Sequence, residues 1–67
     1  MIVLNGESAP FGAGVTLDAV LASLGLTAMS AGVAIAVDRE VVPRAEWETF
    51  ALADGARVEV LTAMQGG

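Results

Sequence analysis

The residues best suited to chemistry are the last ones in the chain, Gln65-Gly66-Gly67. Glycine has no Cβ, so a tail with this ending can enter a narrow channel in a partner, where any side chain would clash. The reactive group that such a tail delivers is the terminal carboxylate of Gly67. Six fully extended residues, beginning at Thr62, span at most about 20 Å, which is enough to reach a buried partner site. The competing interpretation is a frayed terminus that ends in two glycines without a function.

Catalysis by the chain's own side chains is hard to build from its composition. The sequence contains no Cys, His, Lys or Tyr. Their absence excludes disulfides, thiolate and imidazole chemistry, Schiff-base formation and Cys-based zinc or iron–sulfur sites. We therefore expect no catalytic residue, no metal site and no cofactor bound by this chain.

Two further features are weaker candidates for a site. The segment 12–14, Gly-Ala-Gly, precedes an expected helix start, as phosphate-binding loops do, but it lacks the third glycine and the lysine of the known motifs. The carboxylates of Glu46 and Glu48 lie in a polar segment, where a solvated surface is the more common outcome. Trp47, between them, is expected in the core or at its edge.

Length and charge narrow the possible partners. A chain of 67 residues has room for one domain, and its formal net charge of −5 disfavours nucleic acid and anionic lipid. The stretch from Ala19 to Val37 is uncharged, but polar residues and glycines interrupt it and no basic cluster flanks it, so it does not fit a membrane span. No signal peptide is predicted, and the cytoplasm is the expected compartment.

The first half of the chain predicts a hairpin followed by a helix. Asn5-Gly6 is a strong signal for a tight turn, and Pro10 confines the return strand near 7–11 to a sheet edge. Thr16 can cap a helix that ends near Gly25. One apolar stripe on this helix is expected to pack on a sheet. Its members are Leu17, Val20, Leu21 and Leu24.

The second half of the chain predicts three more strands and an irregular segment. Apolar residues alternate with alanine in 33–37, and 41–43 is expected to return as a second hairpin, with Arg39 where glycine would suit the turn better. The segment 44–50 is expected to close one end of the core. In 57–61 charged and apolar residues alternate, which predicts a last strand with its apolar positions facing the helix.

This order of elements predicts an α+β, β-grasp fold, a mixed sheet of about five strands with one main helix packed on one face. The last strand would run parallel to the first in the centre of the sheet. Residues 1–61 would form the domain, and 62–67 a flexible C-terminal tail that ends in Gly-Gly.

Three segments of the chain form a recognisable set. They are Asn5-Gly6-Glu7 in the first hairpin, Val41-Val42-Pro43-Arg44 with Glu46-Trp47 in the middle, and Asp54-Gly55 through Val58-Glu59-Val60 to Gln65-Gly66-Gly67 at the end. With these segments the chain resembles the ThiS family, the ubiquitin-like sulfur carriers of thiamine thiazole biosynthesis, over essentially its whole length. It departs from the family pattern at Arg39, where glycine is common, and in the Ala-rich segment 28–36 around Gly32.

The resemblance implies a function at the terminal Gly-Gly. The carboxylate of Gly67 would be adenylated by a separate E1-like, ThiF-type adenylyltransferase, which uses ATP and Mg²⁺. Sulfur from a persulfide donor would then convert it to a thiocarboxylate. Thiazole synthase of the ThiG type would receive that sulfur, and its channel would hold Met64, Gln65, Gly66 and Gly67. The chain would be a protein co-substrate of these enzymes and not itself an enzyme.

Three alternatives stay open. The sulfur carriers of molybdopterin synthesis have a similar fold and ending, but they usually run longer and have a proline in the tail, so the length and Gln65 favour the thiamine branch. A ubiquitin-like modifier would join Gly67 to lysines of target proteins. A plain interaction domain would make no use of the tail.

Overall fold

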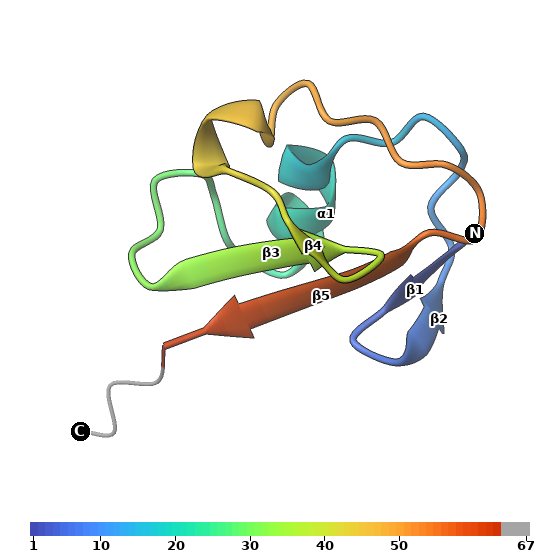
Figure 1. The fold of residues 1–67 in the computed structure, drawn as a ribbon, viewed down its shortest axis with the longest axis horizontal. Helices are drawn as coiled ribbons and strands as arrows, with labels where there is room; N and C mark the ends of the chain where they lie inside the picture. The colour runs from blue at the N-terminus through green and yellow to red at the C-terminus, as the bar shows by residue number, and fades with distance from the viewer. Residues whose placement is uncertain (64–67) are drawn as a thin grey trace.

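The computed structural model describes residues 1–63, which form one sheet with a helix packed across one face (Figure 1). The strands are β1 (Ile2–Leu4), β2 (Glu7–Ala9), β3 (Val33–Val37), β4 (Glu40–Val41) and β5 (Arg57–Thr62). The helices are α1 (Leu17–Ser23) and a single 3-10 turn, η1 (Arg44–Glu46). The strands lie side by side in the order β2-β1-β5-β3-β4.

A parallel pair of strands occupies the centre of the sheet, as predicted. Val3 of β1 lies opposite Arg57 of β5, and Leu4 opposite Val58, while the other strand pairs are antiparallel. β2 ends at Ala9, before Pro10, and forms one edge of the sheet. Both α1 and η1 lie on the same side of the sheet, so the described chain leaves the opposite face uncovered by helix (Figure 1).

The hydrophobic core lies between α1 and the covered face of the sheet. Leu17, Val20 and Leu21 of the helix are buried, and they pack in one cluster with Val58 and Val60 of β5. The alternation in the last strand therefore has the predicted orientation.

Leu24 corrects the predicted helix stripe, because its side chain is 44% exposed. The helix ends at Ser23, and Leu24 takes the C-cap position, where the backbone has left the helical path. Gly25 follows with φ +77°, the left-handed conformation that glycine adopts after many helices. Thr16 stands at the N-cap as predicted, but its hydroxyl donates to the side chain of Asp18 and makes no cap bond to a backbone amide.

Trp47 fills the end of the core beside η1. Its side chain is 1% exposed, and the indole Nε1 donates to the carbonyl of Val42 at 2.9 Å. The guanidinium of Arg44 lies over the ring, 4.6 Å from its centroid. A buried indole whose N–H is bonded contributes a large apolar area without an unsatisfied donor. The prediction that 44–50 closes one end of the core is confirmed.

The turn of the second hairpin holds two residues in the left-handed region. Asp38 has φ 49° and Arg39 has φ 73°. Aspartate tolerates this conformation, and its Oδ1 also accepts a hydrogen bond from the amide of Arg57 at 3.1 Å. Within residues 1–63 no hydrogen bond or ion pair holds the Arg39 side chain. Arg39 therefore adopts a left-handed conformation whose cost no contact of its own side chain offsets.

We expect Arg39→Gly to raise the free energy of unfolding by about 0.5–1 kcal/mol. Relief of left-handed strain is worth roughly 1–2 kcal/mol, and the extra freedom of glycine in the unfolded chain offsets part of it. Asp38→Gly is the matched control and should lower the free energy of unfolding, because it removes the bond to Arg57. Urea denaturation of both variants measures the two effects. A variant Arg39→Gly that is no more stable than the original chain would contradict this view of the turn.

Candidate functional site

The four tail residues predicted to act, Met64, Gln65, Gly66 and Gly67, lie outside the described residues. The structure does describe the base from which they continue, the end of β5 and Ala63.

The chain is bonded to the domain up to Ala63. β5 includes Thr62, one residue past the predicted strand end, and Thr62 lies opposite Val33 of β3. One residue further, the amide of Ala63 donates to the carbonyl of Gly32 at 2.7 Å. Four residues remain beyond this bond, and fully extended they can span at most about 14 Å. This reach is shorter than the reach of about 20 Å expected from the sequence for six free residues beginning at Thr62.

Gly32 allows the close approach of the two segments. Its φ is +72°, and a Cβ built at this position would lie 3.0 Å from the Cβ of Ala63. Any other L-residue here would meet both a backbone strain and a steric overlap. In the sequence, Gly32 is notable only as a glycine within an Ala-rich segment. Its contact with Ala63 could not be predicted, because no nearby residue indicates that partner.

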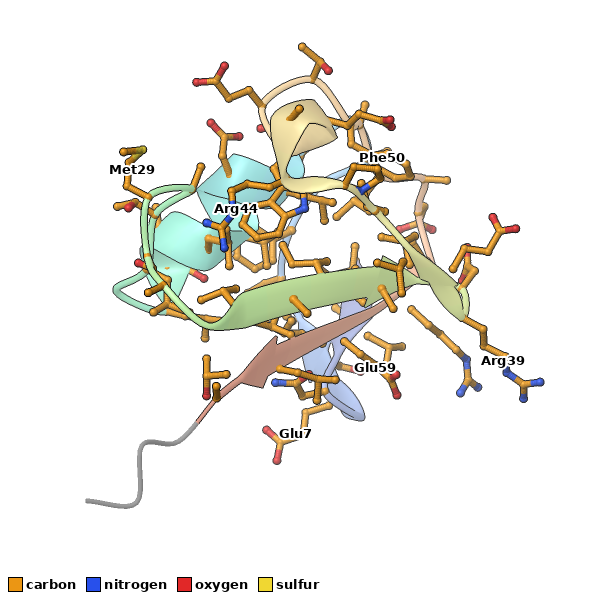
Figure 2. All side chains as sticks on the ribbon, turned by 60° about the vertical axis from the view of Figure 1, so that its left-hand side comes forward. Glu7, Met29, Arg39, Arg44, Phe50 and Glu59 are labelled. Carbon is orange, nitrogen blue, oxygen red and sulfur yellow. The ribbon has the colours of Figure 1, made fainter. Side chains whose placement is uncertain are left out.

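Arg44 fixes the loop that carries Gly32. Its guanidinium, on the helix side of the sheet (Figure 2), donates to the carbonyl of Ala28, to that of Ser30 at 2.9 Å and to that of Val33 at 3.3 Å. The same group stacks on the core indole. A planar cation that binds three carbonyls of one loop holds that loop against the core.

The face of the sheet opposite α1 carries exposed side chains. Leu61 of β5 is 65% exposed and Val41 of β4 is 76% exposed. Figure 2 shows Arg39 and Glu59 extending from the side of the sheet opposite α1. This face combines exposed apolar and charged side chains, with Leu61 near the end of β5 and Arg39 near its start.

The weaker candidates from the sequence do not form a site. The amide of Gly14 donates to the carbonyl of Leu52 at 2.7 Å, and that of Val15 to the carbonyl of Gly12 at 3.2 Å. Because these amides already donate to backbone carbonyls, they are not available to bind an anion. The contacts support a plain turn at 12–14. Over residues 1–63 there is no group of three or more His, Cys, Asp or Glu side chains that could hold a metal ion.

A shallow cavity of about 340 Å³ lies on the helix side of the molecule. It is lined by Asp18, Ala22, Leu26, Thr27, Ala28, Met29 and Glu48. Asp18 accepts a hydrogen bond from the hydroxyl of Thr16, and the hydroxyl of Thr27 accepts one from the amide of Met29 at 3.1 Å, so both side chains make local contacts. None of the helices in the described part of the chain has the length and apolar character to cross a membrane.

The strand order, the single helix across one face and the parallel β1–β5 pair define a ubiquitin-like β-grasp protein. The sequence model of the ThiS family matches residues 2–67. The chain belongs to the ThiS family.

Two solved structures of a Geobacter metallireducens protein are similar to this chain. The crystal structure of its thiamine biosynthesis protein ThiS superposes with a TM-score of 0.74 at 25% identity, covering 98% of this chain and 97% of that one. An NMR structure of a thiamine biosynthesis protein from the same organism has a TM-score of 0.76 at 24% identity, covering 98% and 86%. The second comparison supports the fold alone.

A curated relative, the thiazole synthase of Paramagnetospirillum magneticum, is 35% identical over 66 residues. The match covers 98% of this chain and 20% of the relative. The chain therefore spans about a fifth of the length of that protein.

Proposed function

We propose that this chain is a sulfur carrier whose Gly67 carboxylate becomes a thiocarboxylate that supplies sulfur for thiazole formation in thiamine biosynthesis. The observation that carries the proposal is the match to the ThiS family through residue 67, which includes Gly66-Gly67. The similarity to a protein called thiazole synthase supports the thiazole branch over molybdopterin synthesis.

The chemistry needs partner enzymes because a carboxylate is a poor electrophile. A ThiF-type adenylyltransferase, using ATP and Mg²⁺, would join AMP to the Gly67 carboxylate and release pyrophosphate. Sulfur from a persulfide donor would then displace AMP, and a thiol would reduce the resulting S–S bond to leave the thiocarboxylate. A ThiG-type thiazole synthase would be the acceptor. Carrying sulfur on a tethered group keeps it bound and positioned between these steps.

The contribution of this chain is to present the tail. Gly66 and Gly67 have no side chains to block a channel, and Met64 and Gln65 would line its entrance. The domain supplies a base that is bonded as far as Ala63. The chain has no lysine, so copies of it cannot join one another through isopeptide bonds, which disfavours a chain-forming modifier.

Intact-mass measurement tests the proposal directly. The purified chain, ending at Gly67, is incubated with a ThiF-type enzyme, ATP, Mg²⁺ and a persulfide source. We expect a mass gain that corresponds to the replacement of one oxygen by one sulfur. A folded chain that gains no such mass with several enzymes of this type would contradict the proposal, and amide adducts with other proteins would indicate a modifier instead.

A further inference from the structure

We propose that Gly32 is a positioning residue for the tail, because it holds Ala63 so that the last four residues leave the domain from one fixed point. The proposal rests on the proposed function, since a fixed departure point matters only if Gly67 must reach a partner's reaction site. Gly32 acts through Ala63 and is assigned no catalytic role.

The contact between Gly32 and Ala63 extends the sheet by one step beyond its strands. Val33 lies opposite Thr62 in the antiparallel β3–β5 pair, and Gly32 and Ala63 are the next pair in the same register. The 2.7 Å hydrogen bond between the Ala63 amide and the Gly32 carbonyl closes this step. The domain thus orders the chain up to Ala63, so the first two residues of the predicted tail, Thr62 and Ala63, are bonded to the sheet.

The loop cannot easily move to accept a side chain at position 32. Arg44 binds the carbonyls of Ser30 and Val33, one on each side of Gly32. A Cβ at position 32 would lie 3.0 Å from the Cβ and 3.6 Å from the amide nitrogen of Ala63. Since the loop is held from the core side, the segment that gives way is the one that contains Ala63. A substitution at Gly32 therefore loosens or redirects the start of the tail.

The functional consequence is an entropic one. If the backbone of one residue becomes ordered only when the partner binds, the binding constant falls by about tenfold. The Gly32 contact orders Ala63 before the partner binds, so binding does not carry this penalty. It also limits the reach of the tail to about 14 Å from Ala63. A partner site must therefore lie within that distance of the domain surface.

The test compares Gly32→Ala with Gly12→Ala, a matched control in which a Cβ meets no atom within 4 Å and the backbone is not left-handed. Amide exchange of Ala63, followed by NMR, reports on the contact without any partner enzyme. Steady-state adenylation by a ThiF-type enzyme, with the chain as the varied substrate, gives kcat and KM. We expect Gly32→Ala to speed Ala63 exchange and to lower kcat/KM about tenfold, mainly through KM. Gly12→Ala should change neither quantity.

A rescue experiment separates positioning from general damage to the fold. Adding Ala63→Gly to Gly32→Ala removes the overlapping Cβ and should recover part of the lost kcat/KM. Ala63→Pro removes the amide donor at an exposed position and should lower kcat/KM as Gly32→Ala does, which keeps the test available if Gly32→Ala does not fold. The proposal is overturned if either variant is folded and keeps kcat/KM within twofold of the original chain. If the original chain is never adenylated, the proposed function fails, and Ala63 exchange still decides whether Gly32 holds the base of the tail.

Discussion

Removal of Gly67 is expected to abolish thiocarboxylate formation and to leave the domain folded. The chain ending at Gly66 still has a carboxylate, but it lies one residue, about 3.3 to 3.6 Å, short of the position that a partner site requires. A misplacement of 1 Å can already cost about a hundredfold in rate, so no sulfur-containing product should be detected by intact mass. The free energy of unfolding should stay within about 0.5 kcal/mol of the original value, because the last residue of the described core cluster is Val60 and chain termini contribute little to stability.

Gly66→Val is the complementary variant, since it keeps Gly67 and its carboxylate and adds only a side chain. We expect adenylation to fall by on the order of a hundredfold, because a branched side chain has to enter a channel suited to glycine. Gly12→Val, which adds the same side chain at a glycine of the domain where a Cβ would meet no atom within 4 Å, is the control and should retain activity. Normal adenylation of Gly66→Val would contradict the entry of the tail into a narrow channel. For the chain without Gly67, normal sulfur incorporation would show that the sulfur is attached to another residue.

Trp47→Ala is expected to unfold most of the protein at 25 °C. Truncation of a buried tryptophan costs about 3–5 kcal/mol, and the core of a domain this small rarely supplies more than about 3–5 kcal/mol in total. The change also removes the hydrogen bond to Val42 and the surface on which Arg44 stacks. Arg44 would then hold the loop around Gly32 less firmly. Circular dichroism at 25 °C and a urea titration measure the loss.

Two variants calibrate that result. Trp47→Phe keeps an aromatic ring but leaves the carbonyl of Val42 without its donor, so it should cost about 1–3 kcal/mol. Met29→Ala removes a side chain that is 90% exposed and should change the free energy of unfolding by less than about 0.5 kcal/mol. A urea midpoint for Trp47→Ala equal to that of the original chain would show that the core does not depend on this residue.

Much of the fold could be predicted because its signals are local. Asn5-Gly6 sets a tight turn through its tolerance of positive φ, and the alternation in 57–61 shows which side chains of the last strand are buried. The spacing of Leu17, Val20 and Leu21 identified the helix face that packs on the sheet. These patterns depend on neighbours within a few residues, so they can be read without a structure.

The sequence by itself also determined the family and drew attention to the terminal glycines, since both depend on residue types in order along the chain. Only the tertiary structure decided that Gly32 meets Ala63, that Arg44 holds the loop that carries Gly32, and that Leu24 stays exposed. The Gly32 and Arg44 contacts join residues that lie between 11 and 31 positions apart in the sequence. Sheet register and core packing bring such residues together. Neither the register nor the packing can be predicted from local periodicity in the sequence.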